Sequence, residues 1–355
     1  MMAMNPLPEH DAEPYTTGML DVGDDHQIYF EQCGQPNRLP IVFLHGGPGS
    51  GCSARHRQMF DLRRDRVVLF DQRGCGRSLP RGAVQHNTTA HLVADIERLR
   101  RHLGIERWLV VGGSWGAGLA LAYAAAHQAV CLGLVLRGVF LGRSSDIDWF
   151  FQHARQLLPD AWDALARQAP GLSQGGVIDR TSTDPLGWLA AGVNSDQPQV
   201  AQAAAQAWAA WEKAVSERRW VESVESVERV EGVERVESTP PAVAGEAARA
   251  QVDMYRVQSH YLTNGCFWRD IGLLDRAATL AQVPTAILHG RLDWICRPSA
   301  AWELHRRLPG SRLQWLEDSG HSPFEPAMAR ALTEAMSHFV THGQFAGWGR
   351  RFFAC

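Results

Sequence analysis

The stretch Val110-Val111-Gly112-Gly113-Ser114-Trp115-Gly116-Ala117-Gly118 decides how this chain of 355 residues is read. It has the pattern of an apolar strand that runs into a Gly-x-Ser-x-Gly turn and then into an Ala/Leu-rich helix. A serine at such a bend needs small neighbours, because the backbone is strained and larger side chains would collide. Its hydroxyl is expected beside the N-terminus of the helix, where backbone N–H groups can stabilise an oxyanion. A glycine-rich turn with an incidental serine is the alternative, so the rest of the sequence has to decide.

Composition excludes several classes of function. The formal net charge is −3 and no basic stretch is interleaved with aromatic residues, which argues against a nucleic-acid partner. No apolar run approaches the roughly 20 residues of a membrane helix, and residues 1–14 lack the apolar core of a secretory signal. Seven cysteines without a Cys-x-x-Cys pair argue against a disulfide framework or a zinc site, and Cys75 and Cys296 are interpreted as small buried fillers. We expect a cytoplasmic protein without metal or cofactor; nothing indicates its oligomeric state.

Short apolar runs that end in glycine are typical of strands buried on both faces of a parallel sheet. Helical spacing lies between them, most clearly from Thr88 to Leu103, with Thr88 or Thr89 as a possible N-cap. This alternation predicts a doubly wound, mostly parallel α/β sheet. The expected strands are an alternating segment, Gln27 to Gln35, and the apolar runs Pro40 to Leu44, Val67 to Phe70, Trp108 to Val111, Leu132 to Leu136, Thr285 to Gly290 and Arg312 to Leu316.

A long interval separates the fourth apolar run from the fifth and differs in composition. It contains seven of the thirteen tryptophans and is rich in Ala and Gln, which predicts a mainly helical cap over the carboxyl edge of the sheet. The expected organisation is a core in two parts, 1–140 and 282–355, with the cap at 141–281. Within the cap, Val221 to Ser238 consists of six Val-Glu-x triplets, whose period of three suits neither a helix face nor a strand. A mobile or frayed acidic helix is expected there.

A serine nucleophile needs a base and a group that orients the base, and in hydrolases with this elbow the chain order is serine, acid, histidine. Asp293 follows the apolar run that starts at Thr285, and His321 follows the run that ends at Leu316. Both are therefore expected at the same sheet edge as Ser114. Asp318 is a competing acid, but its closeness to His321 in sequence favours a turn-capping role. The chain thus offers a Ser114/Asp293/His321 triad.

The oxyanion hole of such a site needs two backbone N–H groups. One comes from the residue after the nucleophile, here Trp115, and the other from an early glycine-rich loop, here His45-Gly46-Gly47-Pro48-Gly49. We expect Gly47 as the second donor, with Gly46 as the alternative.

These residues together resemble the proline iminopeptidase family of α/β-hydrolases. The resemblance extends from about Gly18 to Phe339 and implies removal of an N-terminal proline by acyl transfer to serine, without metal. The stretches that carry it are His45 to Gly49, Asp71-Gln72-Arg73-Gly74-Cys75-Gly76-Arg77-Ser78, Gly112 to Gly116, Leu136-Arg137-Gly138-Val139-Phe140 and Gly320-His321-Ser322-Pro323-Phe324-Glu325-Pro326.

The resemblance also implies which cap residues bind substrate. In Trp208-x-x-Trp211-Glu212, Glu212 matches a glutamate that holds the free amine, and such a charge-assisted pair is chemically sound. The family's second glutamate is replaced by Gln258, which should weaken amine recognition. In the aromatic pocket Phe140 is retained, whereas Phe151 and Leu262 stand where Tyr and Phe are frequent.

The sequence therefore predicts a serine aminopeptidase that releases N-terminal proline, or a similar small residue, from short peptides or aminoacyl compounds through an acyl-enzyme. An esterase or amidase that has lost amine recognition through Gln258 is the alternative within the same fold. A non-catalytic binding protein is the alternative from another class.

Overall fold

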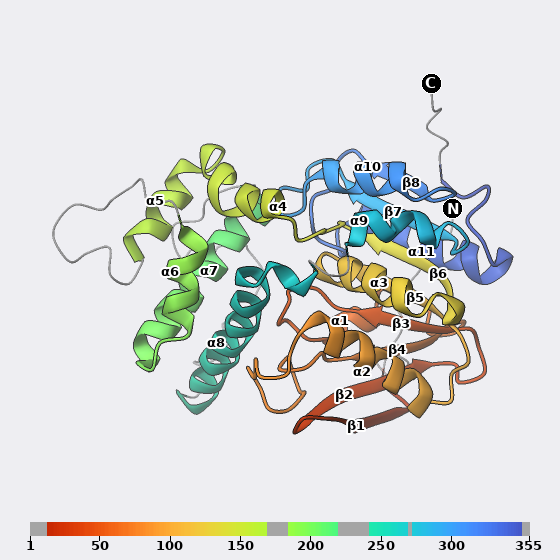
Figure 1. Ribbon diagram of the computed structural model, residues 1–355, viewed down its shortest axis with the longest axis horizontal. Coiled ribbons are helices and arrows are strands. Elements are labelled where there is room, and N and C mark those ends of the chain that lie inside the picture. The colour runs from red at the N-terminus through yellow and green to blue at the C-terminus, as the bar shows by residue number, and fades with distance from the viewer. Residues whose placement is uncertain (1–12, 169–183, 219–240, 269–271, 350–355) are drawn as a thin grey trace, which may run out of the picture.

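The computed structural model describes residues 13–168, 184–218, 241–268 and 272–349, so the Val-Glu-x segment Val221 to Ser238 lies outside the described residues. Eight strands form a single sheet in the order β1-β2-β4-β3-β5-β6-β7-β8 (Figure 1). The strands are β1 Thr16–Gly23, β2 His26–Gly34, β3 Pro40–Leu44, β4 Arg66–Phe70, β5 Trp108–Gly113, β6 Cys131–Arg137, β7 Thr285–Gly290 and β8 Arg312–Leu316.

The sheet is parallel from β4 to β8, as the apolar runs predict. The exception is the edge formed by β1 and β2, which pair antiparallel with each other, while β2 pairs antiparallel with β4. Strand β1 is not among the strands expected from the sequence. Its side chains are mostly exposed or half-buried, so it lacks the apolar run that marks the inner strands.

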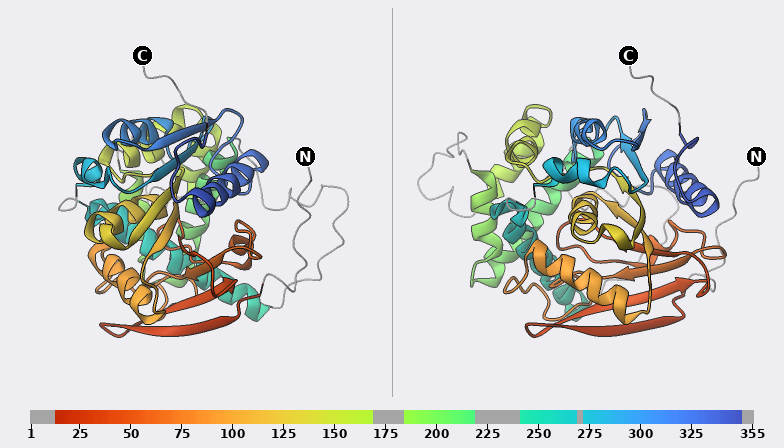
Figure 2. Two further views of the ribbon diagram at one scale, coloured as in Figure 1. Left: turned by 90° about the vertical axis from the view of Figure 1, so that its right-hand side faces the viewer. Right: turned by 45° about the vertical axis from the view of Figure 1, so that its right-hand side comes forward.

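Both faces of the inner strands are buried, which explains their continuous apolar runs. In β3, Val42 and Leu44 point to one face, whereas Ile41 and Phe43 point to the other, because successive side chains of a strand alternate. Helices α2, α3 and α10 cover the first face, and α1 and α11 cover the second (Figure 2). The core helices are α1 Ala54–Arg57, α2 Thr89–His102, α3 Trp115–Ala126, α9 Leu273–Ala277, α10 Pro298–Arg307 and α11 Pro326–His342.

The interval between β6 and β7 is mainly helical in its described part, and it projects to one side of the sheet (Figure 1). Its helices are α4 Ser144–Asp148, a π-helical turn Trp149–His153, α5 Pro159–Gln168, α6 Pro185–Val193, α7 Pro198–Glu217 and α8 Pro241–Thr263. Helix α9 also lies within the expected cap range 141–281, but it packs against α3 and α10 of the core. No helix in the described part of the chain is both long and apolar enough to cross a membrane.

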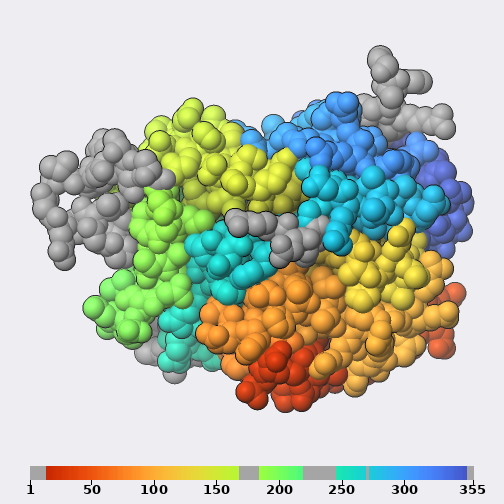
Figure 3. Space-filling model, viewed as in Figure 1, coloured from red at the N-terminus to blue at the C-terminus, as the bar shows by residue number. Residues whose placement is uncertain are grey.

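Helix α8 joins the cap to the core through the loop before α2. The hydroxyl of Tyr261 donates to Oδ1 of the buried Asn87 at 2.7 Å, and Nε2 of His260 lies 2.8 Å from the Asn87 carbonyl oxygen. The next residue, Thr88, is the N-cap residue of α2, although its hydroxyl contacts the ring of His91 and not a backbone N–H. Figure 3 shows this junction at the surface, where the teal cap adjoins the orange segment that contains α2.

The junction can be tested with Tyr261→Phe. The substitution leaves Oδ1 of Asn87 buried without its donor, and an unsatisfied buried polar atom costs about 1–3 kcal/mol. We expect the free energy of unfolding, measured by denaturant titration, to fall by about that amount. Tyr15→Phe is the matched control, because the Tyr15 hydroxyl donates at 3.3 Å on a side chain that is 41% exposed. Equal stability losses in the two variants would contradict the importance of this junction.

Candidate active site

The bend between β5 and α3 holds Ser114 in a strained conformation. Its φ is +58° and its ψ is −124°, values that a residue with a side chain rarely adopts. Two close approaches leave no alternative to glycine on either side. A Cβ on Gly112 would lie 2.2 Å from the Gly116 carbonyl oxygen, and one on Gly116 would lie 2.0 Å from the Leu44 carbonyl oxygen. The Gly-x-Ser-x-Gly pattern is therefore required by packing.

His321 and Asp293 come together at the same edge of the sheet. Nδ1 of His321 lies 2.8 Å from Oδ2 of Asp293, and the backbone N–H groups of Ile295 and Cys296 donate to the other oxygen at 3.0 and 2.8 Å. Burial alone would raise the pKa of Asp293, but the neighbouring His321 and these hydrogen bonds hold it below its ordinary value. The carboxylate therefore stays ionised and can orient the imidazole.

Asp318, the competing acid, has an exposed side chain, and among the described hydrogen bonds none uses its carboxylate. The turn before His321 is held instead by Glu325, which accepts from the N–H of Gly320 at 2.7 Å. The interpretation of Asp318 as a turn cap is therefore wrong.

The Ser114 hydroxyl has a neighbour that the sequence did not indicate. Its Oγ lies 3.7 Å from Sγ of Cys296, and the hydrogen bonds among the described residues include none between Ser114 and His321. Cys296 is buried, as expected, but it also lines the pocket at the serine. In this rotamer the hydroxyl rests against the thiol, and catalytic hydrogen bonds are frequently looser in a free enzyme than in its substrate complex.

The expected oxyanion donors lie close to the serine because β3 and β5 are adjacent parallel strands. A Cβ on Gly46 would be 3.4 Å from Cβ of Ser114, so the loop after β3 lies directly against the nucleophile. Gly47 has a φ of +112° and lines the pocket together with Ser114. The N–H of Trp115 is at the first position of α3, where a helix offers no carbonyl partner.

One pocket contains every substrate residue named from the sequence. Ser114, Gly47 and Cys296 line it, and its apolar lining includes Phe140, Phe151 and Leu262, each of them at least partly buried. Its polar side chains are Asp146, Glu212 and Gln258. The sequence did not single out Phe150, Ile147, Ile295 and Asp146, which complete the lining.

Glu212 is held by two donors from α8. Gln258 donates from Nε2 to Oε1 at 2.6 Å, and the hydroxyl of Tyr255 donates to Oε2 at 2.7 Å. Loss of hydration raises the pKa of Glu212 above its ordinary value, and these two hydrogen bonds offset part of the rise. Among the described residues no ion pair involves Glu212. Asp146 differs, because Arg143 and Arg297 contact its carboxylate at 2.9 and 3.1 Å.

Comparisons with known proteins identify the family of this chain. The α/β hydrolase fold family matches residues 40–327. A proline iminopeptidase from Xanthomonas citri is 42% identical over 329 residues, which cover 92% of this chain and 97% of that protein. The chain belongs to the proline iminopeptidase family. A family member from Arabidopsis thaliana is 40% identical over 91% of this chain and 79% of its own length.

Solved structures show the same fold at lower identity. A proline iminopeptidase from Mycobacterium smegmatis is 22% identical with a TM-score of 0.53, and the match covers 94% of this chain and 100% of that one. The esterase RhEst1 from Rhodococcus sp. ECU1013 is 19% identical with a TM-score of 0.58, over 92% and 98% of the two chains. The architecture is therefore that of an α/β hydrolase.

Arg137 of this proline iminopeptidase family member contacts two parts of the site, a role that no sequence pattern indicates. Its guanidinium donates to the carbonyl oxygen of His321, and its own carbonyl oxygen accepts from the N–H of Ser114 at 2.9 Å. Arg137 is 8% exposed, and no ion pair of the described residues involves it. Burial lowers its pKa, and the charge of Asp293 opposes that shift. A buried arginine without a carboxylate contact is costly, which points to a positioning role.

We therefore expect Arg137→Met to lower kcat roughly ten- to hundredfold with little change in KM, because a small displacement of the base slows the reaction without altering the pocket. Arg137→Lys should recover part of the loss, and circular dichroism should show an intact fold in both. Arg66→Met is the matched control, since Arg66 contacts the neutral Gln32 side chain at 2.8 Å far from the site. Unchanged kcat in Arg137→Met would refute the positioning role.

Proposed function

We propose that this protein is a serine aminopeptidase that releases N-terminal proline from short peptides. The observation that carries the proposal is the pocket lined by both Ser114 and Glu212, a carboxylate without a cationic partner among the described residues. An unpaired carboxylate that has lost hydration is costly unless a ligand supplies the opposite charge, and the amine of an aminoacyl substrate would do so. Family membership, with relatives named proline iminopeptidase, supports the same substrate class.

In the proposed first half-reaction, Oγ of Ser114 attacks the carbonyl carbon of the N-terminal residue while Nε2 of His321 takes the hydroxyl proton. Asp293 stabilises the imidazolium through the 2.8 Å contact to Nδ1. The negative charge on the former carbonyl oxygen is held by the N–H groups of Trp115 and Gly47. The bond to the leaving nitrogen then breaks, and His321 returns its proton to that nitrogen.

In the second half-reaction, water attacks the acyl-serine ester as His321 accepts one of its protons. Collapse of the second tetrahedral intermediate breaks the bond to Oγ, and the proton passes from His321 to Ser114. Proline is released first as the carboxylic acid, which loses its remaining proton to solvent to give the carboxylate. Ser114, His321 and Asp293 are then in their starting protonation states.

The hydrogen-bond positions of Glu212 that Gln258 and Tyr255 leave unoccupied match the donors of an N-terminal proline. An ionised carboxylate has about four acceptor positions, and Gln258 and Tyr255 occupy two of them. The ammonium of an N-terminal proline has two N–H donors, which match the two remaining positions. Phe140, Phe151 and Leu262 would contact the apolar ring.

The cap at 141–281 is proposed as the substrate domain, since α7 and α8 carry Glu212 and Gln258 over the catalytic edge. A covered pocket of this kind suits short peptides better than folded chains. The cytoplasmic location expected from the sequence remains a prediction.

A substrate panel tests this function. Wild-type protein should hydrolyse a prolyl anilide faster than its N-blocked form or a simple aryl ester. Glu212→Gln should lower kcat/KM for the prolyl anilide about 30-fold or more, because removing one partner of a buried charge pair costs about 2 kcal/mol or more. Gln258→Glu should raise kcat/KM, because it adds a carboxylate to the pocket that binds the amine. The increase should be less than about tenfold, because the new carboxylate lies beside Glu212 and the two like charges repel. Ser114→Ala should abolish turnover of every substrate.

The matched control is Glu246→Gln, which removes an exposed glutamate of α8 whose side chain is 67% exposed. Its kinetics should equal those of the wild type. Faster cleavage of the blocked anilide or the ester would favour the esterase or amidase alternative. Failure of Ser114 to react with a fluorophosphonate would favour a binding protein.

The charge state of Glu212 gives a separate test through pH. The ionised carboxylate binds the substrate ammonium and the protonated form does not, so affinity is lost as pH falls through the pKa of Glu212. Because burial raises that pKa, the loss should begin at a higher pH than for an ordinary glutamate. The Kd of a prolyl anilide for the Ser114→Ala variant, measured by calorimetry, should rise up to about tenfold per pH unit below it.

In the variant that combines Ser114→Ala with Glu212→Gln, the prolyl anilide should bind weakly, and its Kd should not change over the same pH range. An unchanged pH profile in this double variant would remove Glu212 as the amine anchor, whatever the outcome of the activity assays.

A further inference from the structure

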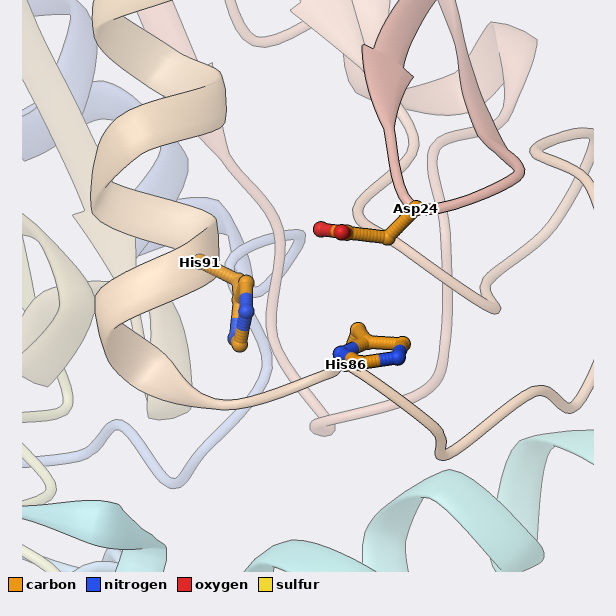
Figure 4. A group of neighbouring side chains, drawn as sticks. All are labelled: Asp24, His86 and His91. Carbon is orange, nitrogen blue, oxygen red and sulfur yellow. The ribbon is translucent and has the colours of Figure 1, made fainter.

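Three potential metal ligands lie together outside the pocket, on the far side of the loop that receives the cap. Asp24 is at the turn between β1 and β2, His86 is in the loop before α2, and His91 is in the first turn of α2 (Figure 4). One ligand atom from each lies within 4.8 Å of the others. Asp24 and His86 are exposed and His91 is partly exposed, so an ion could enter from solvent.

Buried residues hold the segments that carry these side chains. The guanidinium of Arg73 donates to the His86 carbonyl oxygen at 2.8 Å and to Oδ2 of Asp24 at 3.2 Å. Arg73 is itself paired with Asp95 through contacts of 2.6 and 2.9 Å, which balance its charge. The charge left in the cluster is therefore that of Asp24, whose Oδ1 has no contact with Arg73 among the described hydrogen bonds.

The ring of His91 is also oriented. Oγ1 of Thr88 lies 2.8 Å from its Nδ1. A hydrogen bond at one ring nitrogen fixes the tautomer and leaves the lone pair of the other nitrogen for a metal. The His86 and His91 rings meet edge to face with centroids 6.1 Å apart. Both imidazoles can therefore reach one ion with small side-chain rotations.

We propose that Asp24, His86 and His91 form a binding site for a divalent transition-metal ion such as Zn²⁺ or Co²⁺. Two imidazole nitrogens and one carboxylate suit these ions, whereas Mg²⁺ and Ca²⁺ require mainly oxygen ligands. Bond lengths of about 2.0–2.2 Å would draw the three ligand atoms together by roughly 1 Å. Water would complete the coordination.

The site would act on the structure of the cap junction and not on the chemistry at Ser114. His86 and Thr88 flank Asn87, which accepts hydrogen bonds from His260 and Tyr261 of α8. A bound ion would connect the β1–β2 turn to His86 before Asn87 and to His91 in the first turn of α2. It would therefore stabilise the segment that α8 contacts. Metal binding should therefore raise thermal stability while leaving the substrate pocket intact.

The experiment starts from a His338→Ala/His342→Ala background. Those two residues lie at i and i+4 on α11 with ring centroids 4.4 Å apart, so they form a competing metal-binding pair. In this background we expect calorimetry with Zn²⁺ to show one bound equivalent. Co²⁺ should give a visible absorption band, and Zn²⁺ should raise Tm where Mg²⁺ does not.

His86→Ala and His91→Ala, each added to the background, should weaken Zn²⁺ binding about tenfold or more and remove the rise in Tm. Asp24→Asn should weaken binding to a smaller extent. His305→Ala is the control, because His305 contacts Ser311 away from the cluster. Retained prolyl-anilide hydrolysis in all variants will show that they are folded. The proposal would be overturned if the background protein bound no equivalent of Zn²⁺. It would also be overturned if the His86→Ala and His91→Ala variants bound Zn²⁺ as tightly as the background protein does.

Discussion

The close approach of α3 to the loop after β3 is the constraint on which the site depends. The backbone of Gly116 lies against the carbonyl oxygen of Leu44, and Ser114, two residues earlier, has a positive φ. The same contact places Trp115 between the core and the cap. Its ring stacks on Trp268 at 4.9 Å and meets Tyr261 at 4.7 Å, while Nε1 donates to Gln72 at 2.9 Å. Trp115, the residue after the nucleophile, thus has its backbone N–H next to Ser114 and its ring packed against Trp268 and Tyr261. Strain at the serine is offset by packing of the residue beside it.

Charge is distributed unevenly among the buried side chains. Asp95 is paired with Arg73, Asp146 with Arg143 and Arg297, and Asp293 with His321. Glu212 and Arg137 contact neutral groups only, and both lie at the site. These three carboxylates are paired within the protein, and pairing offsets the cost of burying a charge. A carboxylate left without a cation inside a pocket is instead poised for a ligand that brings one.

The sequence predicted the inner strands, the elbow and the acid and histidine loops, because each depends on local pattern. Apolar runs report burial on both faces, and glycines mark the positions where the backbone approaches closely. Other features depend on contacts between distant segments. No local pattern indicates that Arg137 contacts the carbonyl oxygen of His321, 184 positions away, or that the Ser114 hydroxyl contacts Cys296. The cluster of Asp24, His86 and His91 could not be predicted from local pattern for the same reason, because Asp24 and His86 are 62 positions apart. The roles of Glu212 and Gln258 came from resemblance to a family and not from pattern.

The contact of Gln258 with Glu212 changes the expected effect of having Gln at this position. Judged by charge alone, Gln in place of Glu should weaken amine binding, because a neutral amide attracts an ammonium less strongly than a carboxylate does. In the fold, however, its amide donates to Glu212 at 2.6 Å and so stabilises the ionised form of that residue. A glutamate at the same distance would repel Glu212, and two adjacent carboxylates raise the pKa of one another until they share a proton. A pair of that kind carries closer to one negative charge than to two. The exchange of Glu for Gln therefore removes less charge from the pocket than the sequence suggests, and it leaves that charge on a single, well-oriented side chain.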